Sequence, residues 1–144
     1  MEFLSQEEVC AYYALAEALV LPSTYGETWG NVVNEAMACA LPVVVSNQCG
    51  CSSTLVREGE NGWTFDPADR GRLAEIMRLL AQSSDAQRAS MGAASRRVIA
   101  DWPLERFVDG ILAAVRTAGE RPRSAPSPLD RMVLALWNGR YRPT

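Results

Sequence analysis

The chain contains no histidine and no lysine among its 144 residues, so all 14 of its basic side chains are arginines. Without an imidazole, the chain cannot by itself support the serine, cysteine or zinc chemistry that needs a histidine. Without an amine side chain, it can form no Schiff base and has no lysine for a phosphate-binding P-loop. These absences exclude several common enzyme mechanisms within this chain.

Long apolar runs are absent as well. No stretch approaches the ~18 consecutive apolar residues of a membrane-spanning helix, and the hydrophobic share of 48% is ordinary for a globular domain. The first four residues lack the basic region of a signal peptide. They lead into Ser5-Gln6-Glu7-Glu8, a capping box that predicts a helix through Ala16. We therefore expect a cytoplasmic protein.

Cysteine is scarce, and the four cysteines lack the spacing of a structural metal site. We expect Cys10 and Cys39 on apolar helix faces, where they act as small hydrophobic side chains. The pair Cys49 and Cys51 could ligate a metal or be redox-active, but no second pair and no histidine accompanies it, so a reduced loop is favoured. There is also no Asp-x-Asp motif to hold a metal-bridged diphosphate. We therefore expect neither a metal nor a cofactor.

Between residues 18 and 46 the sequence predicts one compact unit of secondary structure. Ala18–Leu21 and Pro42–Ser46 are short apolar runs typical of buried parallel strands. Between these runs, apolar residues recur at helical spacing, at Val32, Val33, Ala36, Met37 and Ala40. The order strand, glycine-containing loop, helix and strand is that of a βαβ crossover.

Two glutamates flank the expected start of this helix. In a βαβ unit, ligands bind beyond the carboxyl ends of the strands, where the first N–H groups of the helix and the positive end of its dipole are exposed. A helix that begins near Asn31 would direct the amides of Gly30, Asn31 and Val32 at a diphosphate. Glu27 lies at this end, and Glu35 lies ~6–8 Å deeper along the axis, where it suits a vicinal diol. The pattern therefore favours a nucleotide-sugar as the ligand.

The spacing Glu27-x7-Glu35, followed by Ala-Met-Ala-Cys-Ala-Leu-Pro-Val-Val-Val-Ser, resembles the signature of retaining glycosyltransferases of family 4. These enzymes have two Rossmann-like domains in the GT-B arrangement, and the C-terminal domain holds the nucleotide-sugar donor. The resemblance implies that Glu27 contacts the donor hexose as the catalytic carboxylate, and that Glu35 contacts the ribose hydroxyls. The implied donor-binding residues are Gly26, Glu27, Gly30, Asn31, Val32 and Glu35.

The resemblance is specific between about Phe3 and Phe65 and continues more weakly to about Ala118. It departs from the family pattern at two positions. Asn31 stands where an apolar residue is common, and Ala40 stands where a glycine is usual. These departures leave donor preference and loop shape open, while both glutamates are retained.

Length limits how much of such an enzyme the chain can hold, because 144 residues suit a single domain. Only three strands are predicted, namely Ala18–Leu21, Pro42–Ser46 and Gly62–Phe65. We therefore predict an α/β fold with a partial Rossmann-like parallel sheet flanked by helices, within the C-terminal half of a GT-B enzyme. We assign this part of the donor domain to residues 1–118. The acceptor domain is expected from a missing N-terminal domain or a partner chain.

Beyond the motif the sequence predicts scaffold. Ser52–Glu58 is expected as a short helix, and Gly59-Glu60-Asn61-Gly62 as a turn in which Asn61-Gly62 supplies the positive φ values. Asp66 is expected to cap the next helix, with Pro67 at its first position. Three amphipathic stripes are expected in the core. They are Leu73, Ile76, Met77 and Leu80; Met91, Ala94, Val98 and Ile99; and Leu104, Phe107, Val108, Ile111 and Val115.

Residues 119–144 are predicted to form a basic tail, rich in arginine and proline, around the short apolar segment Met132–Trp137. From Arg116 to the last residue, six arginines face two acidic residues. A solvated linker is the simplest interpretation. The alternative is a contact of its Arg and Trp side chains with anionic lipid headgroups at the inner membrane face, or with the missing acceptor domain.

Three functions remain open at this point. The first is transfer, with retention, of a glycosyl group from a nucleotide-sugar donor to an acceptor held by another domain or chain. The second is a non-catalytic nucleotide-sugar-binding module or the subunit of a split enzyme. A hydrolase with Glu27 and Glu35 as paired carboxylates ranks last, because one of these acids lies within a helix rather than across a cleft. We expect no nucleic-acid partner.

Overall fold

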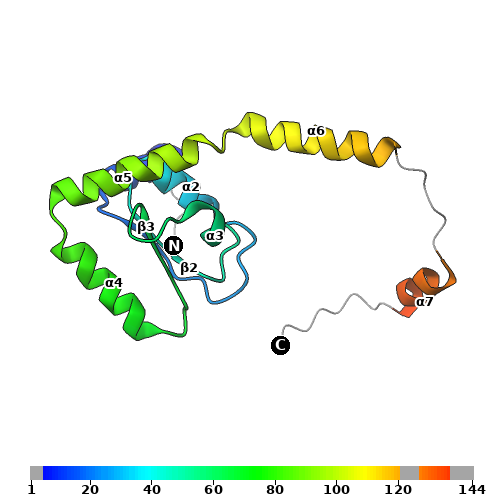
Figure 1. Cartoon of the computed structure of the whole chain (residues 1–144), viewed down its shortest axis with the longest axis horizontal. Helices are drawn as coiled ribbons and strands as arrows, with labels where there is room; N and C mark the ends of the chain where they lie inside the picture. Colours follow the sequence, from blue (N-terminus) through cyan, green and yellow to red (C-terminus); the bar gives the residue numbers. More distant parts are fainter. Residues whose placement is uncertain (1–4, 121–126, 137–144) are drawn as a thin grey trace. The chain divides into compact units, whose positions relative to one another are not determined.

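The computed structural model describes residues 5–120 and 127–136 (Figure 1). The chain divides into two compact units, Met1–Leu104 and Glu105–Thr144. The first unit holds a parallel sheet with its flanking helices, whereas the described residues of the second unit are helical.

The sheet of the first unit has three parallel strands, β1 (Leu19–Leu21), β2 (Val43–Ser46) and β3 (Gly62–Phe65), in that spatial order. Strand β2 is central and buried throughout, as expected for a parallel strand covered on both faces. Among the described residues, the outer edge of β1 pairs with no other strand. The predicted partial α/β sheet is confirmed, and each strand begins at its predicted start or one residue later.

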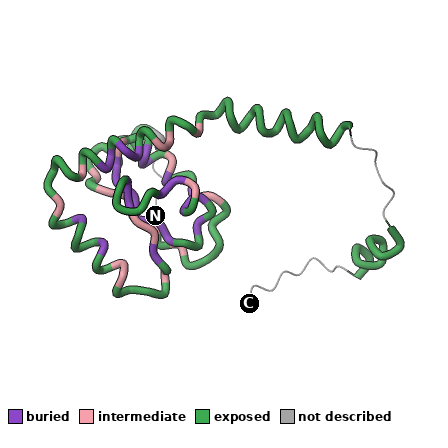
Figure 2. Tube along the Cα trace, viewed as in Figure 1, coloured by how far each residue is buried: buried purple, intermediate pink, exposed green. Residues whose placement is uncertain are grey.

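Helices cover both faces of this sheet, and the buried residues gather in this part of the chain (Figure 2). The helices of the first unit are α1 (Gln6–Leu15), α2 (Asn31–Ala38), α3 (Ser52–Leu55), α4 (Arg70–Gln82) and α5 (Asp85–Ala100). One core cluster joins Val43 and Val45 of β2 to the buried side of α2, with α5 packed behind it. The other cluster joins Val44 to Ile76 and Leu80 of α4. Consecutive valines of β2 therefore pack into core clusters on opposite faces of the sheet.

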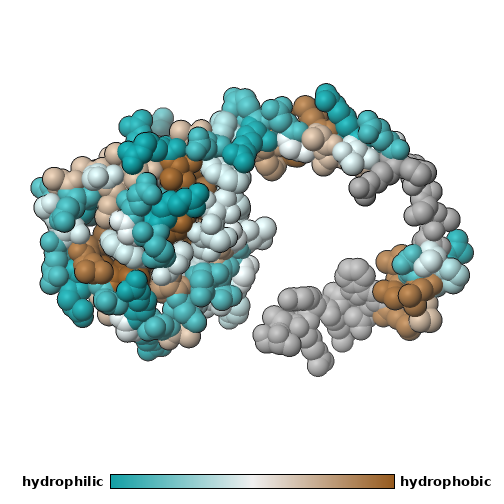
Figure 3. Space-filling model, in the orientation of Figure 1, coloured by the Kyte–Doolittle hydropathy of each residue, from teal (hydrophilic) through white to brown (hydrophobic). Residues whose placement is uncertain are grey.

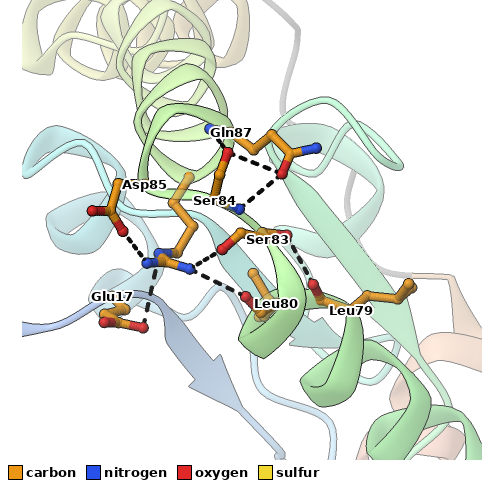
Figure 4. A network of polar contacts seen from close by, with 8 residues as sticks. Glu17, Leu79, Leu80, Ser83, Ser84, Asp85 and Gln87 are labelled. Carbon is orange, nitrogen blue, oxygen red and sulfur yellow. Dashed lines mark hydrogen bonds and ion pairs between the residues drawn. The ribbon is translucent and has the colours of Figure 1, made fainter.

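The corner between α4 and α5 is fixed by Arg88 (Figure 4). Its guanidinium donates hydrogen bonds to the carbonyl oxygens of Leu80 and Ser83. The same group lies 2.5 Å from the Asp85 carboxylate and 3.8 Å from that of Glu17. Because Glu17 precedes β1, these contacts connect the start of the sheet to the corner.

The start of α4 differs from its prediction. The helix begins at Arg70 with Asp69 as its cap, and not at Pro67 with Asp66 as its cap. The Asp69 side chain accepts a hydrogen bond of 2.8 Å from an amide in the first turn. Asp66 closes the preceding turn instead, where its carboxylate accepts the amide of Ala68 at 2.8 Å. Both acids are suitable caps, so local preference alone did not decide between them.

The turn before β3 also differs, because its positive φ of 72° is at Gly59 and not at Asn61 or Gly62. Asn61 is fully buried, and its side chain bridges the amide of Arg57 at 2.7 Å and the carbonyl oxygen of Leu55 at 3.0 Å. At Gly62, a Cβ would overlap a carbonyl oxygen of β2. Close strand packing, rather than a turn conformation, therefore requires this glycine. Helix α3 is correspondingly shorter than predicted.

Helix α2 ends in a left-handed residue that is not a glycine. Ala40 has a φ of 60°. Its amide donates to the carbonyl oxygen of Met37, and the amide of Leu41 donates to that of Ala36, both at 3.0 Å. This pair of bonds defines a Schellman motif, in which glycine is the preferred residue at the left-handed position. Ala40 is therefore strained at the place where the family resemblance leads us to expect glycine.

The second unit contains most of α6 (Leu104–Glu120) and all of α7 (Pro128–Leu136). Apolar side chains lie at the surface of both helices (Figure 3). The stripe of α6 was predicted to be core, but its residues are 45–72% exposed, so that prediction is wrong for this chain. Met77 of α4 is likewise exposed. Part of the predicted linker is the helix α7, while Trp137 and most of the tail arginines lie outside the described residues. None of the described helices has the length and apolar character to cross a bilayer.

Candidate functional site

Two loops meet beyond the carboxyl ends of β1 and β2. The amide of Glu27 donates to the carbonyl oxygen of Gln48 at 3.0 Å, and the carbonyl oxygen of Glu27 accepts the amide of Gly50 at 2.8 Å. A Cβ at Gly50 would overlap the carbonyl oxygen of Thr28, so a glycine is needed for the loops to approach this closely. Backbone contacts thus fix Glu27 against the loop that follows β2.

A cavity of about 550 Å³ opens beside these loops. It is lined by Glu27, Asn47, Gln48, Cys49, Gly50, Ser52, Ser53 and Thr64. Of the predicted site residues, all of which lie in the described part of the chain, Glu27 alone lines this cavity, and its side chain is exposed. The carboxylate, amide and hydroxyl groups that line the cavity are of the kinds that hydrogen-bond a polyhydroxylated ligand.

Helix α2 begins at Asn31, within the range that the sequence predicts. Its N-cap is Gly30, whose φ of 99° and ψ of 65° favour glycine. A Cβ at this position would also lie only 3.1 Å from Cδ2 of Leu21. The cap residue provides no side-chain hydrogen bond, so the first N–H groups depend on other acceptors. Asn31 and Val32 are exposed, and the positive end of the helix dipole is therefore accessible to an anion.

Glu35 lies one turn into α2 and is exposed. The hydroxyl of Tyr13, on α1, donates a 2.9 Å hydrogen bond to Oε2 of Glu35. Burial of the Tyr13 ring, and then its hydrogen bond to the Glu35 carboxylate, raise the pKa of Tyr13 to about 12. Glu35 does not line the cavity that contains Glu27. The two carboxylates therefore occupy separate surroundings.

Trp29 holds the loop between the two glutamates. Its indole Nε1 donates to Oδ1 of Asn34 at 3.0 Å, which ties the loop to the first turn of α2. Its ring lies 5.7 Å from that of Trp102, centroid to centroid, at an angle of 47°. Sequence reasoning missed Tyr13, Trp29 and Trp102 as neighbours of the site. Only the position of Trp29 directly before the N-cap of α2, four residues ahead of the turn that holds Val33 and Asn34, could have indicated part of this arrangement.

The cysteines fall into two groups, and only the first differs from its prediction. Cys10 and Cys39 are exposed, so the expectation that they pack on apolar faces is wrong. Cys49 and Cys51 are buried next to the loops of the site. Burial, and then the neighbouring Cys49, raise the pKa of the Cys51 thiol to about 11, which leaves it protonated and unreactive at neutral pH. In the described residues, no three side chains of the metal-binding types are grouped to hold an ion.

Comparison with known proteins gives a family match for most of the chain. Residues 1–98 match the family described as glycosyl transferases group 1. The chain is 33% identical over 135 residues to the D-inositol 3-phosphate glycosyltransferase of Geodermatophilus obscurus, covering 90% of this chain and 29% of that protein. It is 35% identical over 111 residues to the enzyme of the same name from Thermobifida fusca, covering 77% of this chain and 25% of that protein.

Two solved structures also share the fold of this chain. The sucrose-phosphate synthase of Thermosynechococcus elongatus matches with a TM-score of 0.67 and 30% identity, over 83% of this chain and 30% of that structure. Anabaena HepE, solved in complex with UDP, shares the fold with a TM-score of 0.65 and 23% identity, over 74% of this chain and 29% of that structure.

The three-stranded parallel sheet with its flanking helices thus corresponds to part of a GT-B structure. The chain belongs to the group 1 glycosyl transferases, which confirms the resemblance to family 4. It spans less than a third of the length of the relatives that it matches.

Proposed function

We propose that this chain supplies the donor-binding half of a glycosyltransferase that transfers a glycosyl group, with retention, from a nucleotide-sugar. The observation that carries the proposal is the position of Glu27, which is fixed by backbone bonds on a polar cavity beside the uncapped start of α2. A nucleotide-sugar needs a site for an anion next to a site for hydroxyl groups. The loop and the helix start offer both.

The diphosphate is assigned to the start of α2. The amides of the N-cap Gly30 and of Asn31 and Val32 in the first turn have no acceptor within the helix. Together with the helix dipole they stabilise an anion, and Gly26 lies in the same loop before Glu27. Because the chain has no lysine, further positive charge must come from arginine or from a domain outside this chain.

The two glutamates are assigned different parts of the donor. Glu27 faces the cavity with the hydroxyl and amide side chains and is the proposed catalytic carboxylate, in contact with the hexose. Glu35, one turn deeper and outside that cavity, is assigned to the ribose diol. The relatives include D-inositol 3-phosphate glycosyltransferases and a protein solved in complex with UDP, so UDP and its sugars are the first donors to test.

The acceptor is assigned to a region outside this chain, because the chain spans only 29% of the first relative. We place the protein in the cytoplasm, where nucleotide-sugar donors are made available to such enzymes. The basic residues 119–144 are assigned to a contact with the missing acceptor domain or with anionic lipid headgroups at the inner membrane face. Because the chain spans so little of its relatives, a non-catalytic binding module or a split-enzyme subunit is the second candidate.

Glutamine substitutions test the division of roles in an enzyme restored with an N-terminal half. Glu35→Gln should weaken the nucleoside diphosphate and its sugar conjugate alike, by ~1.5–3 kcal/mol for a lost charge-assisted hydrogen bond. Glu27→Gln should spare the affinity for the free diphosphate and lower kcat, because charge develops on the hexose in the transition state. Calorimetry with both ligands and steady-state kinetics measure these effects.

Glu105→Gln, an exposed carboxylate on α6, is the matched control and should change neither quantity. Equal losses of diphosphate affinity in Glu27→Gln and Glu35→Gln would refute the division of roles. A restored complex that binds the donor but shows no turnover would favour the non-catalytic module.

A further inference from the structure

One contact of the site comes from an element that the βαβ motif does not include. Tyr13 lies on α1, 22 residues before Glu35, and its hydroxyl donates to Oε2 of that glutamate at 2.9 Å. Glu35 makes no other side-chain hydrogen bond and no ion pair that the described residues show. Tyr13 is thus the group that fixes where this carboxylate points.

The Tyr13 end of the contact is held firmly. Its ring packs against the core cluster that includes Val33 and Met37 of α2, so the hydroxyl is presented from a fixed position. Glu35 itself is exposed on the helix surface. An exposed glutamate samples several rotamers, and ordering it on binding costs conformational entropy. A hydrogen bond from a packed tyrosine removes part of that cost before the ligand arrives.

The chemistry of the contact leaves the carboxylate able to bind a ligand. An ionised carboxylate has two oxygens with about four acceptor positions, and the tyrosine hydroxyl occupies one of them. A phenol is also neutral, so it orients Glu35 without neutralising its charge as an arginine would. Both oxygens therefore remain available to two adjacent hydroxyl donors.

We propose that Tyr13 is a positioning residue that orients the Glu35 carboxylate toward the ribose diol of the donor. This inference rests on the proposed function, because it names the group that supports the assigned role of Glu35. The pKa of Tyr13, raised to about 12, keeps its hydroxyl protonated and able to donate this hydrogen bond across the physiological range.

The test uses the 144-residue chain and two probes, UDP and its 2′,3′-dideoxy analogue, titrated by nuclear magnetic resonance. Tyr13→Phe removes the hydroxyl and keeps the packed ring. It should weaken UDP binding about 3- to 10-fold, as expected for the loss of one supporting hydrogen bond. Binding of the dideoxy analogue should change by less than about twofold, since it has no diol for Glu35 to hold.

The matched control is Tyr12→Phe, an exposed tyrosine one residue earlier on the same helix, which should leave both affinities unchanged. In a Glu35→Gln background, Tyr13→Phe should cause no further loss, because the two residues act as one unit. Side-chain order parameters of Glu35 in the unliganded chain should fall in Tyr13→Phe and not in Tyr12→Phe.

Equal losses for UDP and the dideoxy analogue would overturn this inference, as would unchanged Glu35 order parameters in Tyr13→Phe. Either result would leave the proposed function standing, because wild-type binding is measured in the same series. Failure of the wild-type chain to bind UDP or GDP would overturn the proposed donor site, and the positioning role with it.

Discussion

Helices α5 and α6 follow one another along the chain, yet they meet very different surroundings. α5 buries Met91, Gly92, Ala94 and Ser95 against the rest of the first unit. α6 has a regular apolar stripe over about three turns, and every residue of this helix is exposed. An amphipathic period therefore shows that a helix has an apolar face that can be buried. It does not show whether residues of the same chain bury that face.

The glycines of the two helices give the sharpest form of this comparison. A Cβ at Gly92 in α5 would overlap the carbonyl oxygen of Ala40, because α5 crosses the end of α2 there. A Cβ at Gly110 in α6 would meet nothing within 4 Å. The same substitution should therefore act in opposite directions in the two helices.

We expect Gly92→Ala to destabilise the first unit by about 4 kcal/mol or more, since the clash is with backbone and can be relieved only by moving a helix. Gly110→Ala should instead stabilise α6 by about 0.5–1 kcal/mol, as alanine does for glycine in an exposed helix. Thermal and urea unfolding, followed by circular dichroism and by resolved amide resonances, would measure both. Similar destabilisation by the two substitutions would show that α6 is packed in solution.

Truncation of an isoleucine extends the comparison to side-chain packing. Ile76→Ala in α4 removes a fully buried side chain and should cost about 2–5 kcal/mol. Ile111→Ala in α6 removes a side chain that is 48% exposed, and it should change the free energy of unfolding by less than about 0.5 kcal/mol. Urea unfolding of the two variants measures both changes in the free energy of unfolding. A cost above 1 kcal/mol at Ile111 would reveal a partner for the α6 stripe, such as a second copy of the chain.

The smallest effect concerns the strained end of α2. Ala40→Gly should stabilise the first unit by about 0.5–1 kcal/mol, because relief of the left-handed strain exceeds the added entropy of the unfolded chain. Gly59 has a φ of 72°, and Gly59→Ala provides the reverse control, which should destabilise by a similar amount. An unchanged midpoint of thermal unfolding in Ala40→Gly would mean that Ala40 does not keep its left-handed conformation in solution.

Much of the site could be predicted because it is local in sequence. The strands around β2 and the start of α2 follow from apolar periodicity and one glycine, and these place Glu27 and Glu35 on either side of a helix start. The start of α4 could not be predicted, since Asp66 and Asp69 are equivalent caps by local preference. Which one is used depends on how the turn joins β3.

Other features depended on packing between distant segments. The contact of Tyr13 with Glu35 joins two helices, and that of Trp29 with Trp102 joins the loop to the end of α5. No spacing rule connects such pairs. The exposure of the α6 stripe was also missed, because periodicity carries no information about which chain buries a face.

The central claim is that the start of α2 binds the donor diphosphate while the acceptor machinery lies elsewhere. A nuclear magnetic resonance titration of the 144-residue chain with UDP and GDP, accompanied by an assay for turnover of their sugar conjugates, tests it most directly. Amide shifts should be concentrated at Gly30, Asn31, Val32 and Glu35, with no turnover, because no acceptor is held beside the donor. Shifts confined to α6 and α7, no shifts at all, or turnover above background would contradict it.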